Sequence, residues 1–236
     1  VDFRYNKANT LANISHGAAG DKLKVNFSAS YTFQDNYLPP VDFTREAIKL
    51  APNAPALYDA GGNLNWENST FTNPLASLEG DFTARTYDLI ANTVLTYDIL
   101  DGLQAKVGMG YTDLRHIERQ TLPSTMYNPS YGYGSEISLA YINRVDRNSW
   151  IIEPQLSYKK DFEKLGFELL AGGSFQKRSD SKLVQRGYGF SSNSLIDDPA
   201  SANTYSVLEG SNTLYKYRAF FGRLNINLDK RYYLNL

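Results

Sequence analysis

Apolar and polar residues alternate along much of this chain with a period of two. The clearest case is 23–34, where the odd positions from Leu23 to Phe33 are apolar or aromatic and the even positions are polar. Side chains of a strand point alternately to its two faces, so this pattern predicts a strand with one apolar face. Similar patterns predict further strands at 83–99, 103–115, 148–159, 165–176 and 218–228, with a weaker one at 9–15. A turn at 229–230 and a last strand follow, so we expect an all-β chain of about eight strands.

The predicted connections alternate between short and long. Short turns are expected at 16–21, 100–102, 160–164 and 229–230, and the pair Asp101-Gly102 is a strong hairpin signal. Long loops are expected at 35–82, 120–146 and 177–212, the first with a short helix at 44–50. Outer-membrane barrels show this sorting, with short periplasmic turns and long extracellular loops.

The central parts of the predicted apolar rows carry no charged side chain: Leu23–Phe33, Tyr87–Tyr97, Leu103–Tyr111, Trp150–Tyr158, Leu165–Phe175 and Phe220–Leu228. A soluble sheet that faces a core would share this feature, so the spacing of aromatic residues is needed to decide. Tyr87 and Tyr97 lie ten residues apart on one row, which spans roughly 25 Å of a membrane at about 3.3 Å per residue and the usual strand tilt. We therefore predict an antiparallel transmembrane β-barrel segment. Its other face is expected to line the lumen, through Lys24, Lys106, Glu153, Glu168 and Arg223.

One residue disturbs the predicted strands. Pro154 lies on the apolar row of 148–159, and proline has no N–H to donate to a ladder. We expect a β-bulge there.

Composition removes several classes of function. The net charge is −1 with no excess of cations, so nucleic acid is not an expected partner. The chain has no cysteine, which excludes disulfides and thiolate metal sites. No apolar run reaches about 18 residues, so no spanning helix is expected. The mean hydropathy of −0.43 agrees with strands that alternate.

Three stretches resemble a known family. Residues 221–234 read F-G-R-L-N-I-N-L-D-K-R-Y-Y-L, with Ile226 where an aromatic residue is usual; residues 63–75 with 89–103, and P-S-T-M-Y-N-P at 123–129, are also similar. The family is the SusC/RagA-type TonB-dependent outer-membrane transporters of Bacteroidetes. The resemblance implies a barrel of about 22 strands, of which residues 1–236 are a partial barrel domain without the plug domain or the TonB box.

The resemblance also implies partners and cargo. These are outer-membrane lipid, a SusD-like surface lipoprotein that covers the barrel, the protein's own plug domain and the TonB complex. The implied cargo is an oligosaccharide or a peptide, and the implied location is the outer membrane.

Aromatic residues of the predicted loops are candidates for contact with substrate or the lipoprotein lid, because rings stack on sugars and anchor interfaces. They also have a structural interpretation, in which they pack the loops together. The candidates are Tyr58, Trp66, Tyr127, Tyr131, Tyr133, Tyr188 and Phe190.

No catalytic set is visible, so an enzyme is not expected. His16 and His116 have no partner nucleophile or ligand set in the sequence. Residues 59–65 and Asp197-Asp198 offer oxygen ligands for Ca²⁺, but a plain turn at Gly61-Gly62 explains the first as well. We expect no cofactor and no metal site.

Two other functions stay open at this point. Eight strands can close by themselves, so a small self-contained outer-membrane barrel with a structural or adhesive role is one alternative. A soluble β-rich carbohydrate-binding module is the other. The chain's end within a strand favours a section of a larger barrel.

Overall fold

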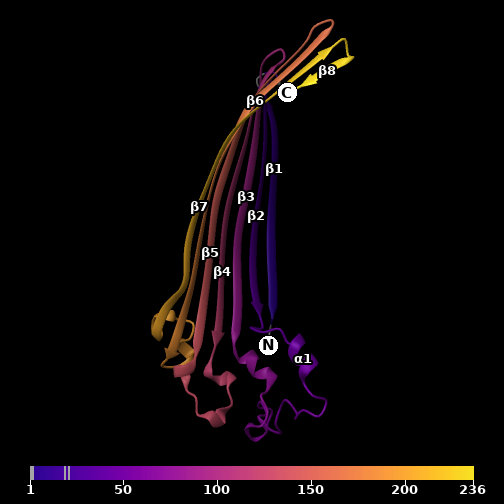
Figure 1. Ribbon diagram of the computed structural model, residues 1–236. Helices are drawn as coiled ribbons and strands as arrows, with labels where there is room; N and C mark the ends of the chain where they lie inside the picture. The colour runs from indigo at the N-terminus through magenta and orange to yellow at the C-terminus, as the bar shows by residue number, and fades with distance from the viewer. Residues whose placement is uncertain (1–2, 19, 21) are drawn as a thin grey trace.

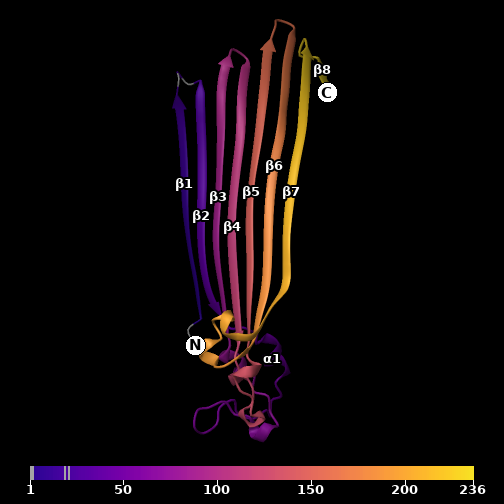
Figure 2. The ribbon, with the colours of Figure 1, turned by 90° about the vertical axis from the view of Figure 1, so that its left-hand side faces the viewer.

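The structure is a computed structural model that describes residues 3–18, 20 and 22–236. It is one antiparallel sheet whose eight strands follow one another in sequence order (Figures 1 and 2). The strands are β1 (Arg4–Ala18), β2 (Leu23–Leu38), β3 (Asp81–Leu100), β4 (Leu103–Leu122), β5 (Leu139–Asp161), β6 (Leu165–Phe190), β7 (Ala202–Leu228) and β8 (Tyr232–Asn235). The predicted all-β antiparallel fold is confirmed.

The connections are sorted by length. The turns that join β3 to β4, β5 to β6 and β7 to β8 are short and lie at one end of the sheet, and the long loops lie at the other (Figure 1). The loops hold α1 (Thr44–Lys49), where a helix was expected, and seven 3₁₀ turns: η1 (Glu67–Ser69), η2 (Pro74–Glu79), η3 (Ser124–Met126), η4 (Pro129–Tyr131), η5 (Ser135–Ile137), η6 (Asn193–Leu195) and η7 (Pro199–Ser201).

The strand register places the predicted apolar rows on one face. Tyr97 of β3 lies opposite Leu23 of β2 and Ala105 of β4, and Leu156 of β5 lies opposite both Ala105 and Ala171 of β6. Residues that lie directly opposite in an antiparallel pair share a face. The apolar rows therefore form one continuous surface, which we call the outer face. The intervening polar rows form the other, which we call the lumen face.

Aromatic rings mark both edges of the apolar surface. Toward the loops, Phe33 contacts Tyr87 with ring centroids 5.3 Å apart, and Phe175 contacts Phe220 at 5.8 Å. Toward the short turns, Tyr158 contacts Phe167 at 6.3 Å. Two aromatic girdles around an apolar band are typical of a barrel wall in a membrane.

The short turns use the residues that the sequence suggested. Gly102 has φ of 81°, and Asp229 and Lys230 have φ of 51° and 56°. Two consecutive positive φ values make a type I′ hairpin turn, whose twist matches that of the strands it joins. In the first predicted turn, His16 and Gly17 belong to β1, and residues 19 and 21 lie outside the described ranges.

All three predicted long loops were too long, the first by only a few residues at each end. Residues 139–146, 177–190 and 202–212 belong to β5, β6 and β7. Polar side chains occur on both faces there, as with Arg178 and Ser179, because these parts of the strands project beyond the apolar band. Without lipid on one side, the period-two pattern is lost.

The bulge expected at Pro154 was wrong. Pairing of β5 with β6 stops between Ile152 and Gln155, but the register is the same on both sides of this gap. Pro154 still lies opposite Val107 of β4. The strand tolerates the missing donor by losing ladder bonds on one side only.

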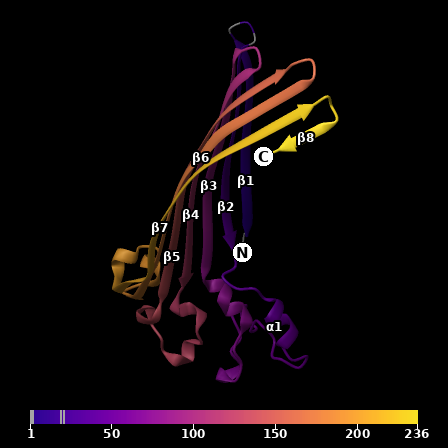
Figure 3. The same cartoon turned by 45° about the horizontal axis from the view of Figure 1, so that its top comes forward.

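The sheet is open within the described residues. β1 pairs with β2, and β8 pairs with only the end of β7, from Asn225 to Leu228. No pair between β1 and β8 occurs in the parts of the chain that the structure describes. The wall is twisted. In Figure 3, the ends of β6 and β7 near the turns lean away from the corresponding ends of β1 to β3.

Candidate functional site: the loop cap and the lumen face

The three long loops pack into one body, which we call the loop cap (residues 39–80, 123–138 and 191–201). A small apolar core holds it to the ends of the strands. Phe190 is 2% exposed and packs with Ala140, Ile196 and Ala202. The core therefore joins β5, β6 and β7 to the last of the loops.

Hydrogen bonds among three polar residues tie two of the loops together. The Ser138 hydroxyl, which is fully buried, donates to Asn193 Oδ1 at 2.6 Å and accepts from the Ser124 N–H at 2.8 Å. Asn193 Nδ2 donates back to Ser124 Oγ at 3.0 Å. This closed set satisfies groups that would otherwise be buried without partners.

The first loop joins the same body. Asn128 Nδ2 donates to Ser69 Oγ at 3.0 Å, and Ser69 Oγ lies 2.7 Å from Ser130 Oγ. Within the first loop, the buried Asn73 donates to the carbonyls of Leu57 and Asn65 at 2.6 and 3.0 Å. The loops are thus held by specific polar contacts.

Three tyrosines form an exposed cluster on the cap. The rings of Tyr127 and Tyr133 are perpendicular with centroids 5.7 Å apart, and Tyr131 lies 5.5 Å from Tyr133. Their exposed fractions are 42%, 51% and 54% for Tyr127, Tyr133 and Tyr131. Gly132, with φ of 65°, lets the chain reverse between the last two rings. The sequence placed these residues in one loop, and the structure brings their rings into contact.

The other aromatic candidates lie apart from this cluster. Tyr58 is exposed next to a single bridge with Leu64, and Trp66 is half-buried. Tyr188 and Phe190 belong to β6 and not to a loop, which corrects the predicted boundary. Tyr188 is exposed, whereas Phe190 packs in the core of the cap and has no surface for a ligand.

The five charged residues expected on the wall all lie on the lumen face. Lys24 and Lys106 both lie opposite Thr96 and are exposed. Arg223 forms an ion pair with Glu168 at 3.1 Å.

The remaining member of this set is Glu153. Its carboxylate accepts from Ser174 Oγ at 3.1 Å. The lumen face is thus a wet surface with cross-strand polar contacts.

Sequence reasoning missed polar contacts in the strand segments between the aromatic girdle and the cap. The Asp180 carboxylate accepts from both Arg147 Nε and Arg178 Nε at 2.6 Å. His116, expected to be an unpartnered histidine, lies in β4 with Nδ1 2.7 Å from Thr86 Oγ1 and Nε2 3.0 Å from a Glu118 oxygen. These contacts depend on the register between strands. The sequence does not reveal that register here, because the apolar alternation ends at the aromatic girdle.

The carboxylates of the cap are used by the backbone. Asp59 Oδ1 accepts from the N–H groups of Gly61 and Asn63, each at 2.8 Å. The bond from Asn63 holds the pKa of Asp59 below its usual value. Asp198 caps η7 through the N–H of Ala200 at 3.0 Å, and Asp197 pairs with Arg119 at 3.3 Å. Among the described residues, no group of three histidine or acidic side chains is placed to hold a metal ion.

Helices contribute little to this architecture. Across residues 3–18, 20 and 22–236, no helix is both long and apolar enough to cross a membrane.

The architecture is that of an outer-membrane β-barrel wall. An apolar outer face lies between two aromatic girdles, the lumen face is polar, and the short and long connections lie at opposite ends. These features define the type of fold, the wall of a membrane β-barrel.

Comparison with solved structures shows where this fold occurs. The chain is similar to the RagAB peptide transporter, with a TM-score of 0.74 and 18% identity over 99% of this chain and 27% of that one. The RagAB peptide importer matches with TM-scores of 0.73 in its "closed-closed" and 0.75 in its "open-open" state, at 17% identity and the same coverage. The fold is that of a section of a TonB-dependent transporter barrel, which confirms the resemblance to the SusC/RagA type at the level of the fold.

The chain spans about a quarter of the length of the structures it matches. Searches against protein-family models and curated protein sequences give no match.

Proposed function

We propose that residues 1–236 are part of the barrel domain of a TonB-dependent outer-membrane importer, in a longer protein that also contains a plug domain and a TonB box. The supporting observation is the one-sided wall, which follows the RagAB structures over 99% of this chain. The open edges of the sheet fit a wall that continues into further strands. The matched structures are transporters, and we propose transport without a catalytic step.

The two faces of the wall suggest its partners. The apolar outer face contacts outer-membrane lipid. The lumen face contacts the plug through Lys24, Lys106, Glu153, Glu168 and Arg223, which present charges and polar groups toward the interior. The TonB complex acts on the plug from the periplasm. No nucleic acid is involved.

The loop cap suggests a lid and a cargo. A SusD-like lipoprotein covers the cap, as expected for an importer of the kind found in Bacteroidetes, and the exposed Tyr127, Tyr131 and Tyr133 cluster is its anchor or a contact for cargo. Tyr58, Trp66 and Tyr188, which lie apart from this cluster, are further candidates for such contacts. The cargo is an oligosaccharide or a peptide, as the family resemblance implies, and the exposed tyrosine rings offer apolar faces for such a cargo. No cofactor or metal takes part.

The proposal is tested by uptake in cells that make the full-length protein. Fluorescent oligopeptides and oligosaccharides are supplied to wild-type cells, to cells without the gene and to cells treated with a proton uncoupler. We expect one class to enter only with the gene and only with a proton gradient. Uptake that persists in the uncoupler would contradict a TonB-driven importer.

A variant connects uptake to the cap. Replacing Tyr127, Tyr131 and Tyr133 with alanine is expected to lower uptake or lipoprotein capture, with Tyr205→Ala, an exposed strand tyrosine, as the control. If the small self-contained barrel were correct instead, residues 1–236 alone would show heat-modifiable migration in detergent. The open sheet argues against that result.

A further inference from the structure

Three cations gather on the outer face of β6 and β7, directly beyond the aromatic girdle near the loops. Lys177 of β6 lies opposite Lys216 of β7, and Arg218 lies opposite Phe175. Phe175 belongs to the girdle through its contact with Phe220. The register therefore places all three cations, which we call the cation triad, on the side that faces lipid and at the level where the apolar band ends.

The triad is electrostatically unfavourable by itself. Like charges directly opposite on neighbouring strands destabilise a sheet, and Lys177 and Lys216 are such a pair. All three side chains are exposed, and none forms an ion pair with another residue of the described ranges.

Most other strand cations of the outer face have carboxylate partners, and Arg144 is the exception among the described residues. Arg85 pairs with Asp35 at 2.8 Å, and Arg115 pairs with Asp146 at 3.4 Å. The missing counter-charge of the triad is thus expected from outside the chain.

A groove joins the triad to the girdle. It has a volume of about 530 Å³, and its apolar side is formed by Trp150, Ile152 and Phe175. The triad forms its charged side. Such a groove fits a molecule that carries an anionic group next to hydrocarbon chains.

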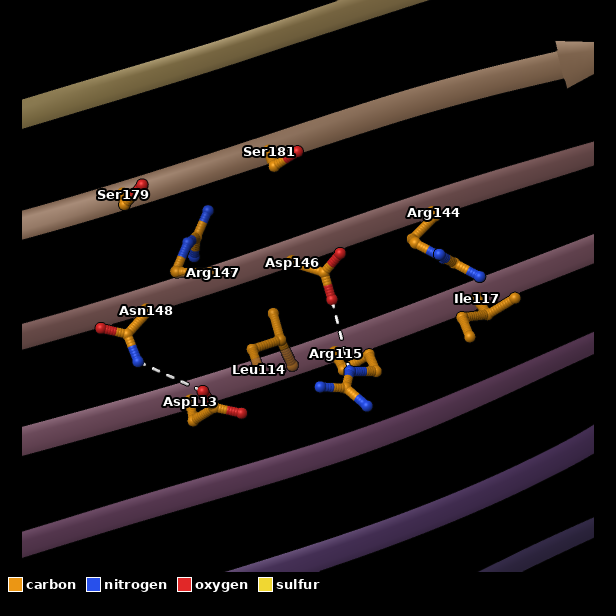
Figure 4. A pocket seen from close by; sticks show the side chains of 10 residues that line it. All are labelled: Asp113, Leu114, Arg115, Ile117, Arg144, Asp146, Arg147, Asn148, Ser179 and Ser181. Carbon is orange, nitrogen blue, oxygen red and sulfur yellow. Dashed lines mark hydrogen bonds and ion pairs between the residues drawn. The ribbon is translucent and has the colours of Figure 1, made fainter.

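A second groove of about 540 Å³ continues on the same face toward the loops. Ser179 and Ser181 lie on the same row as Lys177, and Asn148 lies opposite Ser179. Figure 4 shows these hydroxyl and amide groups together with Arg115 and Arg144, and with the bond from Asn148 to Asp113. Neutral polar groups beside a cation cluster are suited to sugar hydroxyls.

We propose that this surface binds a phosphorylated glycolipid of the outer leaflet. The acyl chains lie on the apolar band, a phosphate lies on the cation triad, and the sugars contact Asn148, Ser179 and Ser181. The order along the face is apolar, cationic, then polar, and it matches the order of these parts in the lipid. The site requires the wall to lie in a membrane, but it is independent of the transported cargo.

The test uses the full-length protein in non-ionic detergent, with lipid binding measured by native mass spectrometry. The probe is bisphosphorylated lipid A, a diglucosamine lipid, compared with its dephosphorylated form, with phosphatidylglycerol and with inorganic phosphate. We expect lipid A to bind about tenfold more tightly than its dephosphorylated form, since a charge-assisted contact is lost. Phosphatidylglycerol is expected to bind more weakly than lipid A.

Variants locate the site. The triple variant K177Q/K216Q/R218Q is expected to bind lipid A about tenfold less tightly. The triple variant K7Q/R45Q/K49Q removes the same charges from exposed positions away from the outer-face triad and is expected to bind normally. Asn148→Ala with Ser179→Ala should weaken lipid A and leave phosphatidylglycerol unchanged. Folding of the first triple variant is checked by heat-modifiable migration. If it folds poorly, the single variant K216Q is used instead and is expected to lose part of the lipid A affinity.

Three results would overturn the proposal. Equal binding by the two triple variants would remove the triad from the site. Equal affinity for lipid A and phosphatidylglycerol would show a general anionic-lipid surface without sugar recognition. If inorganic phosphate at millimolar concentration displaced lipid A completely, the surface would be a simple anion site without lipid recognition.

Discussion

Gly102 occupies a position of the wall where a side chain does not fit. Its φ of 81° is unfavourable for any residue with a Cβ, and a Cβ built there would lie 2.1 Å from the Lys159 carbonyl oxygen. The Gly102 carbonyl also accepts from the Lys159 N–H at 2.8 Å. The turn between β3 and β4 therefore contacts β5 through a position that only glycine fits.

We predict that Gly102→Ala destabilises the protein by more than backbone strain alone. The left-handed conformation costs roughly 1–2 kcal/mol for alanine, and the contact with Lys159 adds to it. Gly132→Ala is the matched control, because Gly132 has φ of 65° but no atom within 4 Å of its Cβ position. The free energy of unfolding in urea, measured on the full-length protein in lipid vesicles, is expected to fall more for Gly102→Ala. Equal losses would show that the contact is unimportant.

Asp59 gives the loop cap a pH dependence. Its pKa lies below the usual 3.8 because the backbone N–H of Asn63 binds the charged form. The stabilisation is therefore fully present above that usual value and is lost as the pH falls through the lowered pKa.

We predict that amides 59–64 exchange hydrogen faster below about pH 4, after correction for intrinsic rates. In Asp59→Asn they are expected to exchange fast at every pH. Asp101→Asn, at the opposite end of the sheet, should leave their profile unchanged. A wild-type profile that stays flat down to pH 2 would contradict the role given to Asp59.

At the scale of the strand, the sequence predicts only the part of each element that lies between the girdles. In β6 the alternation holds from Leu165 to Phe175 and fails from Lys177 onward, although the strand continues to Phe190. Water contacts both faces of that distal part, so neither row is constrained to be apolar. For the same reason, the sequence pattern did not predict the contacts of Asp180.

The candidate site was predictable only where its members are close in sequence. Tyr131 and Tyr133 flank a glycine in one loop, and the structure places their rings together. The bond from Ser138 to Asn193 joins residues 55 positions apart. Serine and asparagine are ordinary loop residues, so no local pattern marks this contact.

The two faces of β3 give a direct test of the membrane assignment. Ala91 lies on the outer face near the middle of the band between Tyr87 and Tyr97, and Asn92 lies on the lumen face. We predict that Ala91→Arg lowers the free energy of unfolding in lipid by about 2–4 kcal/mol, since it places a charge near the bilayer midplane. Asn92→Arg, the same new side chain one residue away, should cost much less. The reverse order would mean that the faces are exchanged.

At the scale of the molecule, three loops from different parts of the chain act as one cap. Ser138 links two of these loops, because its buried hydroxyl accepts a hydrogen bond from the Ser124 N–H and donates one to Asn193 Oδ1. Removal of the hydroxyl leaves these polar groups without a partner, at a cost of about 1–3 kcal/mol.

We predict that Ser138→Ala opens the cap locally and leaves the wall intact. Limited proteolysis of the full-length protein is expected to cut faster within 123–138 and 191–201, with no change in heat-modifiable migration. Ser194→Ala, at an exposed position of the same cap, is the control. Unchanged cleavage in Ser138→Ala would mean that the loops are held by the Phe190 core alone.

The neighbour-only pairing of the wall has a consequence for how such a wall is made and enlarged. In the described part of the chain, each strand pairs with the strands directly before and after it in sequence. Each hairpin can therefore be added to a finished edge without rearranging earlier pairs. Within a hairpin, conformational entropy is lost over only a short turn. Duplication of one hairpin widens the circumference by two strands and leaves the older contacts in place. In the described residues β8 pairs with β7 only from Asn225 to Leu228, so the rest of that edge presents backbone N–H and C=O groups with which another strand can pair.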